Sequence, residues 1–225
     1  MDKKYLLFDL DGTLTDPKEG ITKCVQYALE AEGIIEPDLD KLECYIGPPL
    51  DVSFKTFHGL SEEASWKAVD KYRERFKDIG IFENAVIDGI LPCLETLKAA
   101  GKVLVLATCK PEIFAFKIME HFGLDKYFDI MVGSELDGTR KHKHEVIEEV
   151  FIRLQKSGFQ EDILQMKADA IMIGDRDQDI NGAKMAGIES IGVRFGYAAE
   201  NELEDAGADY IVETVPQLTA LILAG

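Results

Sequence analysis

The chain has 225 residues and a formal net charge of −17, from 25 Lys and Arg against 42 Asp and Glu. Hydrophobic residues make up 46 % and charged residues 30 %, a balance typical of a folded globular protein rather than a disordered one. Because so acidic a chain repels nucleic-acid phosphates and anionic membrane surfaces, we expect neither a nucleic-acid polymer nor a membrane as its partner.

Five short apolar runs predict the strands of a parallel sheet. The first is Tyr5 to Leu10, and the others are 103–107, 130–132, 170–173 and 190–193. Continuous apolar runs are typical of strands that are buried on both faces. Amphipathic stretches that end at Gly101 and Gly158 lie between strands. This alternation predicts an α/β fold with a doubly wound, Rossmann-like sheet.

The interval from Pro17 to about Phe82 breaks that alternation, because it contains no convincing strand. One amphipathic helix is expected to end at Gly33, and a second is expected to begin after Ser61. The apolar stripe of the second helix consists of Trp66, Val69, Tyr72, Phe76 and Ile79. We therefore predict a helical subdomain at 17–82, inserted into a core domain made of 1–16 and 83–225.

Cysteine usage and apolar run lengths indicate the compartment. Cysteines 24, 44, 93 and 109 have the spacing of neither a zinc site nor a disulfide framework, so we expect free thiols in a reducing compartment. No apolar run approaches the about 20 residues of a membrane span. Asp9 interrupts the first run after only four apolar residues, too few for the apolar region of a signal peptide. We expect a cytoplasmic protein.

Polar side chains are expected at the carboxyl ends of the predicted strands, where a doubly wound sheet binds its ligands. Asp9, Asp11 and Thr13 follow the first run, Thr108, Cys109 and Lys110 follow the second, and Asp175, Asp177 and Asp179 follow the fourth. Lys141 and Lys143 stand just before the helix that begins near residue 144. Because crowded carboxylates repel one another, a divalent cation is needed, and an all-oxygen site suits Mg²⁺. A hydroxyl and a lysine would hold anionic oxygens of the substrate. The set predicts phosphoryl transfer with an aspartate nucleophile.

Other phosphate chemistries lack their sequence signatures. There is no G-x-x-x-x-G-K-[ST] loop, and no cysteine is followed six residues later by arginine. The run from Asp175 begins like a calcium loop, but Ile180 stands where that loop requires glycine.

Four stretches resemble the four motifs of the haloacid dehalogenase superfamily of phosphatases. They are Phe8–Asp16, Leu106–Thr108, Lys143 and Ile173–Asp179, and their order and spacing match the family from end to end. The insert at 17–82 resembles the small helical cap of that superfamily. The resemblance implies a Mg²⁺-dependent hydrolase of phosphate monoesters that works through an aspartyl phosphate.

The resemblance also assigns roles to the carboxylates. Asp9 would attack phosphorus, and Asp11 would protonate the leaving oxygen and then deprotonate the hydrolytic water. General acid–base catalysis of this kind typically raises the reaction rate about 10²–10⁴-fold. The Asp9 carboxylate, the Asp11 backbone carbonyl and Asp175 would hold Mg²⁺, while Asp179 would orient a ligand water or the motif-three lysine.

The remaining motif residues would bind the phosphoryl group. Thr108 would contact a phosphoryl oxygen, and Lys143 would neutralise the nucleophile and the phosphate. Gly12 would let the backbone approach the phosphate closely. Cys109 departs from the Asn or Ser that is common in the family, and we expect a small neighbour of the phosphate loop there. Further lysines could offset negative charge near the site: Lys23, Lys55 and Lys110.

Two assignments are less specific. Motif three offers Lys141 and Lys143, and we favour Lys143 because it adjoins the helix expected near His144. The strings Ser134–Arg140 and Tyr45–Leu50 resemble a subgroup of phosphoglycolate phosphatases and 5′-nucleotidases.

We therefore expect hydrolysis of a small cytosolic phosphate ester, with phosphoglycolate as the first substrate and a nucleoside monophosphate as the alternative. A β-phosphoglucomutase-type phosphosugar mutase is a further alternative, which Thr13 weakly disfavours by the habits of the family. A catalytically silent relative would be expected to lose one motif residue, and none is lost. The sequence leaves open whether the protein is a monomer or a homodimer.

Overall fold

The computed structural model describes residues 1–159 and 161–224. It divides into two compact units. The core unit comprises Met1–Leu14 and the chain from Val86 onward, and the inserted unit is Thr15–Ala85. The insert expected from the sequence spans residues 17–82, whereas the compact unit in the structure is Thr15–Ala85.

A parallel sheet forms the centre of the core unit. Within the described residues its strand order is β5-β4-β1-β6-β7-β8, so the chain winds outward in both directions from β1. The strands are β1 (Tyr5–Phe8), β4 (Val103–Pro111), β5 (Ile130–Ser134), β6 (Ala170–Gly174), β7 (Glu189–Val193) and β8 (Tyr210–Val212). This order confirms the predicted doubly wound α/β fold.

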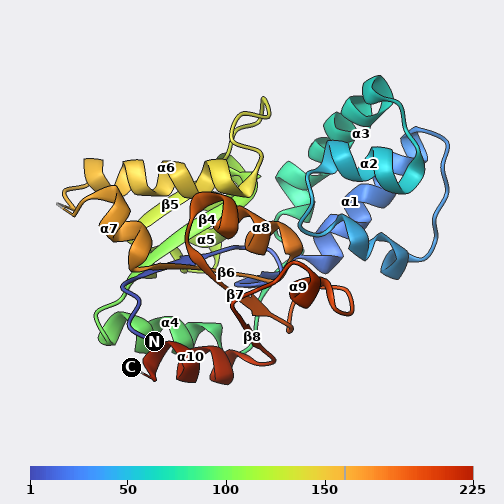
Figure 1. The fold of residues 1–225 in the computed structure, drawn as a ribbon. Coiled ribbons are helices and arrows are strands. Elements are labelled where there is room, and N and C mark those ends of the chain that lie inside the picture. The colour runs from blue at the N-terminus through green and yellow to red at the C-terminus, as the bar shows by residue number, and fades with distance from the viewer. Residues whose placement is uncertain (160, 225) are drawn as a thin grey trace. The chain divides into compact units, whose positions relative to one another are not determined.

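Helices cover both faces of this sheet (Figure 1). One face carries α6 (Lys143–Lys156), α7 (Ile163–Ala168) and α8 (Asp177–Ala186), and the other carries α4 (Ile90–Ala99) and α10 (Val215–Leu223). The core unit also contains α5 (Glu112–His121) and two short segments, η3 (Asp125–Tyr127) and α9 (Glu202–Asp205). Every residue of β1 is fully buried, because successive side chains enter opposite cores. That double burial explains the continuous apolar run.

Strand β8 was not expected from the sequence. It is only three residues long and pairs with β7 at the sheet edge, where Tyr210 is 38 % exposed. A strand this short and this exposed carries too few apolar positions to form a recognisable run.

The inserted unit is built almost entirely of helices. They are α1 (Lys18–Ala31), the 3₁₀ segment η1 (Leu39–Tyr45), α2 (Leu50–His58), α3 (Glu62–Arg75) and the π-helical segment η2 (Phe76–Gly80). Two short strands, β2 (Thr15–Asp16) and β3 (Ala85–Val86), pair where the chain enters and leaves it. The Ser61 hydroxyl caps α3 by accepting the Ala64 N–H at 3.2 Å.

The apolar stripe expected after Ser61 is interrupted at its end. The α-helix stops at Arg75, and the following π turn, with its i→i+5 hydrogen bond from the Ile81 N–H to the Phe76 carbonyl at 2.8 Å, places more residues in each turn. As a result Phe76 is buried, whereas Ile79 is 54 % exposed.

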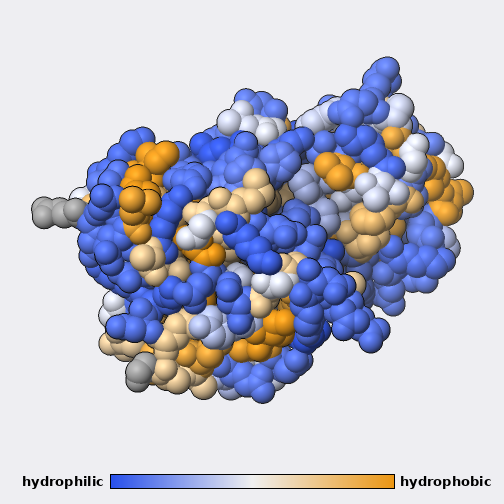
Figure 2. Space-filling model, in the orientation of Figure 1, coloured by the Kyte–Doolittle hydropathy of each residue, from blue (hydrophilic) through white to orange (hydrophobic). Residues whose placement is uncertain are grey.

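The surface visible in Figure 2 is mainly hydrophilic, as is typical of a folded globular protein. Hydrophilic residues cover most of the face drawn in Figure 2, and apolar residues form separate patches there. Within the described residues, no helix combines the length and the apolar character that crossing a membrane requires.

Candidate active site

Three neighbouring strands bring polar side chains to one edge of the sheet. Asp9 follows β1, Thr108 lies near the end of β4, and Asp175 follows β6. The Asp9 N–H donates to the Ile173 carbonyl at 2.9 Å, which ties the end of β1 to β6. Because β4 and β6 flank β1, the three side chains emerge side by side at the carboxyl edge.

Lys143 adds a buried cation to this edge from the first position of α6. Its Nζ lies 2.9 Å from Asp9 Oδ1 and 2.7 Å from Asp179 Oδ1. The same ammonium donates to the Ala107 carbonyl at 2.9 Å. Gly182 of α8 leaves room for it, since a Cβ there would lie 2.5 Å from the Lys143 Cβ. Lys143 therefore contacts the candidate nucleophile Asp9, helix α8 through Asp179 and strand β4 through the Ala107 carbonyl.

Three buried carboxylates form a cluster that fits a divalent cation. One oxygen from each of Asp9, Asp175 and Asp179 lies within 4.8 Å of the others. The single ammonium of Lys143 cannot balance three carboxylates, so the cluster keeps an excess of negative charge. Hard oxygen donors with excess negative charge are the ligands that Mg²⁺ or a similar ion prefers.

Asp175 is the most enclosed of the three carboxylates. It accepts the Tyr197 N–H at 2.7 Å and the Thr13 hydroxyl at 3.4 Å. Two glycines press against it: a Cβ at Gly12, where φ is +77°, would lie 2.1 Å from its Oδ2, and a Cβ at Gly196 would lie 2.4 Å away. No other residue type fits these two positions without moving Asp175.

Burial raises the pKa of two of these carboxyls. The pKa of Asp175 lies well above its ordinary value because of burial and the nearby charges of Asp179 and Asp9. Burial raises the pKa of Asp179 to about 6, although Lys143 opposes the rise. Burial lowers the pKa of Lys143, but Asp179 and Asp9 more than offset this, so its pKa is raised and it stays charged. A bound cation would relieve the repulsion among the carboxylates.

Asp11 lies apart from the cluster and has its own cation. Its Oδ2 is 2.5 Å from the Nζ of Lys110, and the two side chains are 11 % and 8 % exposed. Burial raises the pKa of Asp11, and Lys110 opposes that rise. A carboxyl that is protonated more easily than usual suits a group that exchanges protons.

The segment after Ala107 carries the phosphate-binding candidates. Thr108 is 2 % exposed, and its Oγ1 accepts the Lys110 N–H at 3.2 Å. The Cys109 carbonyl accepts the Ser134 hydroxyl at 2.7 Å. Burial raises the pKa of the Cys109 thiol to about 12, so this thiol is protonated near neutral pH and is not an activated nucleophile.

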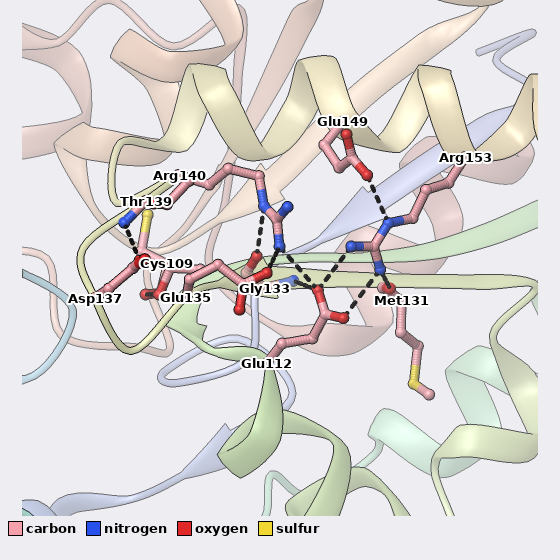
Figure 3. A network of polar contacts seen from close by, with 11 residues as sticks. Cys109, Glu112, Met131, Gly133, Glu135, Asp137, Thr139, Arg140, Glu149 and Arg153 are labelled. Atoms are coloured by element: carbon pink, nitrogen blue, oxygen red, sulfur yellow. Dashed lines mark hydrogen bonds and ion pairs between the residues drawn. The ribbon is translucent and has the colours of Figure 1, made fainter.

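Glu112 fixes the loop that leads to Lys143 (Figure 3). Its carboxylate accepts the Gly133 N–H at 3.2 Å and pairs with Arg140 at 3.4 Å and Arg153 at 3.0 Å. Arg140 adopts a φ of +56°, a left-handed conformation that is uncommon for a side-chain-bearing residue, and its Nε also donates to the Gly133 carbonyl. Because Glu112 begins α5, this network ties the end of β4 to the loop before α6.

The expected site residues fall into two groups. Asp9, Asp175, Asp179 and Lys143 are in one cluster, as described, and Asp11 stands beside Lys110. Asp179 uses both oxygens within the protein, since Oδ1 contacts Lys143 and Oδ2 accepts the Arg176 N–H at 3.1 Å.

The other lysines that the sequence suggested have separate surroundings. Lys23 pairs with Glu83, and Lys55 pairs with Glu62, both inside the inserted unit. Sequence reasoning missed the pairing of Lys110 with Asp11. It also missed the Tyr197 N–H, because a backbone donor leaves no residue-type signal.

Comparisons with known proteins agree with this arrangement. A family model described as haloacid dehalogenase-like hydrolase matches residues 6–193. The chain is 48 % identical to a 5′-nucleotidase of Pseudomonas aeruginosa over 198 residues, which cover 88 % of this chain and 86 % of that protein. It is 27 % identical to a phosphoglycolate phosphatase of Colwellia psychrerythraea, with 96 % of each chain covered. A crystal structure of a phosphatase from Clostridium acetobutylicum, itself assigned by prediction, matches with a TM-score of 0.91, 46 % identity and 100 % coverage of both chains.

Proposed function

We propose a mechanism and a substrate class for this chain, which belongs to the haloacid dehalogenase-like hydrolase family and is a phosphatase. The proposal is hydrolysis of nucleoside 5′-monophosphates with Mg²⁺ as cofactor and Asp9 as nucleophile. The observation that carries the mechanism is the buried cluster in which Lys143 contacts Asp9 while Asp175 and Asp179 lie nearby.

In the first step an Asp9 oxygen attacks phosphorus while the bond to the leaving oxygen breaks. Lys143 holds Asp9 in place and offsets the charge of the incoming phosphate. The leaving oxygen keeps the electron pair of the bond that breaks, and it receives a proton from Asp11. In the second step Asp11 accepts a proton from water as the water oxygen attacks phosphorus, and the Asp9–phosphorus bond breaks.

The other residues bind and orient. Thr108 is proposed to donate its hydroxyl to a phosphoryl oxygen, and Gly12 to let the backbone come close to the phosphate. Asp9 and Asp175, with the Asp11 carbonyl, are proposed to hold Mg²⁺, and Asp179 to keep Lys143 in position. When bound, Mg²⁺ would offset charge on the substrate oxygens.

The substrate class follows from the relatives. The 5′-nucleotidase is 48 % identical to this chain, whereas the phosphoglycolate phosphatase is 27 % identical. This difference supports a nucleoside monophosphate ahead of phosphoglycolate, the first substrate expected from the sequence. Phosphoglycolate stays the second candidate, because the relative of that name spans almost the whole chain.

The test is phosphate release from AMP, UMP, phosphoglycolate, pyrophosphate and β-glucose 1-phosphate, with Mg²⁺ or with EDTA. We expect the highest kcat/KM on a nucleoside monophosphate, dependence on Mg²⁺, and no turnover by Asp9→Asn. A higher kcat/KM on phosphoglycolate would overturn the nucleotide assignment alone. Isomerisation of β-glucose 1-phosphate without phosphate release would favour a mutase. Full activity of Asp9→Asn would overturn the mechanism.

A further inference from the structure

Lys110 is a buried cation that the proposed mechanism does not yet use. Its Nζ lies 2.5 Å from Asp11 Oδ2, and its side chain is 8 % exposed. The other buried lysine of this edge, Lys143, contacts Asp9 and Asp179. The nucleophile and the proton-exchanging acid therefore each have a separate ammonium partner.

The backbone around Lys110 is held by several contacts. Its N–H donates to Thr108 Oγ1 at 3.2 Å, and the preceding carbonyl, of Cys109, accepts the Ser134 hydroxyl at 2.7 Å. A Cβ at Gly133 would lie 2.7 Å from the Lys110 carbonyl oxygen, so β5 approaches the segment as closely as a glycine allows. The register between β4 and β5 shifts between Ala107 and Pro111. This irregularity sets the direction in which Lys110 leaves the strand.

The two oxygens of Asp11 have different surroundings. Oδ2 is taken by the ammonium, whereas Oδ1 is buried and has no hydrogen-bond partner among the described residues. A carboxylate that accepts a charge-assisted hydrogen bond at one oxygen loses most of its freedom to rotate, so the position of its other oxygen is fixed as well. A buried carboxylate oxygen without a hydrogen-bond partner in the part of the chain that the structure describes is available to contact a substrate atom.

We propose that Lys110 is a positioning residue, which holds Asp11 by Oδ2 and thereby presents Oδ1 to the leaving oxygen of the substrate. The inference rests on the proposed function, in which Asp11 supplies that proton. Lys110 acts through Asp11 and forms no bond to the substrate.

The test compares two leaving groups in Lys110→Met, which removes the charge and keeps most of the apolar stem. The alcohol of AMP leaves poorly without a proton, whereas p-nitrophenolate leaves without one. The ratio kcat/KM reports the steps up to the first departure of the leaving group, so it isolates this proton transfer from the later hydrolysis of the aspartyl phosphate. We expect kcat/KM to fall about 10²-fold on AMP and less than about threefold on p-nitrophenyl phosphate.

Three further variants sharpen the comparison. Asp11→Asn should show the same dependence on the leaving group. The double variant with Lys110→Met should have the same kcat/KM on AMP as Asp11→Asn alone, because the two residues act as a unit. Lys110→Gln keeps a hydrogen-bond donor and should recover part of the loss on AMP. Lys117→Met, which changes an exposed lysine of α5, should match the wild type. The inhibition constant of inorganic phosphate should be unchanged in Lys110→Met, and its thermal unfolding should be cooperative.

If kcat/KM of Lys110→Met fell equally on AMP and on p-nitrophenyl phosphate, and inorganic phosphate inhibited it more weakly, Lys110 would be shown to bind the phosphoryl group. That result would overturn the proposal. Unchanged kcat/KM on both substrates would overturn it as well. Failure of the proposed function is seen separately, in a protein that keeps Lys110: full activity of Asp9→Asn would contradict the mechanism on which this inference rests, whatever Lys110→Met does.

Discussion

Replacing Lys143 by methionine should destabilise the protein strongly. The variant leaves the Asp9 and Asp179 carboxylates buried without the ammonium that now lies 2.9 and 2.7 Å from them. Removing one partner of a buried ion pair costs about 3–5 kcal/mol. A domain of this size loses about 2–4 °C of Tm per kcal/mol, so the metal-free variant should unfold about 6–20 °C below the wild type. Methionine keeps most of the apolar stem, so little of this loss comes from packing.

Thermal unfolding in EDTA near neutral pH measures this effect, with Lys117→Met as the matched control. Lys117 is exposed on α5, and its replacement should change the free energy of unfolding by no more than about 0.5 kcal/mol. Added Mg²⁺ should narrow the difference for Lys143→Met, because the ion supplies positive charge to the same carboxylates. A Tm equal to that of the wild type in EDTA would refute the electrostatic account of the cluster.

Three other predictions follow from the same contacts. Gly12→Ala should cost at least about 1 kcal/mol and most of the phosphatase activity, since a Cβ would lie 2.1 Å from Asp175 Oδ2 at a φ of +77°; urea unfolding and phosphate release measure both. Glu112→Gln should cost about 1–3 kcal/mol by weakening its ion pairs with two arginines, and proteolysis of the loop before α6 should become faster. Because the folded-state pKa of Asp179 is raised to about 6, the metal-free protein should lose stability as pH rises from about 4 through about 6; Tm against pH in EDTA should show this fall, Mg²⁺ should remove it, and Asp175→Asn should reduce it.

The central strands could be predicted because each lies between two cores. Tyr5–Phe8 is buried on both sides, and no surface requirement interrupts its apolar run. The same reasoning placed Asp9 and Asp175 at one edge, since both follow neighbouring parallel strands. Lys143 could be favoured over Lys141 because a residue at a helix start has a defined position, and α6 indeed begins at Lys143.

The parts that escaped prediction depend on backbone geometry at a distance. The sequence suggested Lys110 as a source of positive charge, but its partner depends on the irregular register of β4 and β5 after Ala107. The contact of Tyr197 with Asp175 uses a main-chain N–H, which any residue except proline supplies. The π turn at Phe76–Gly80 exposes Ile79, and no pattern of apolar residues reveals such a turn in advance.

The central claim is that Asp9 carries the phosphoryl group. Rapid acid quenching of the enzyme during AMP turnover, followed by mass spectrometry of its peptides, tests it most directly. The account predicts one added phosphoryl group on the peptide that contains Asp9, its absence in Asp9→Asn, and no turnover by that variant. Turnover by Asp9→Asn at the wild-type rate, or a phosphoryl group on another residue, would contradict it.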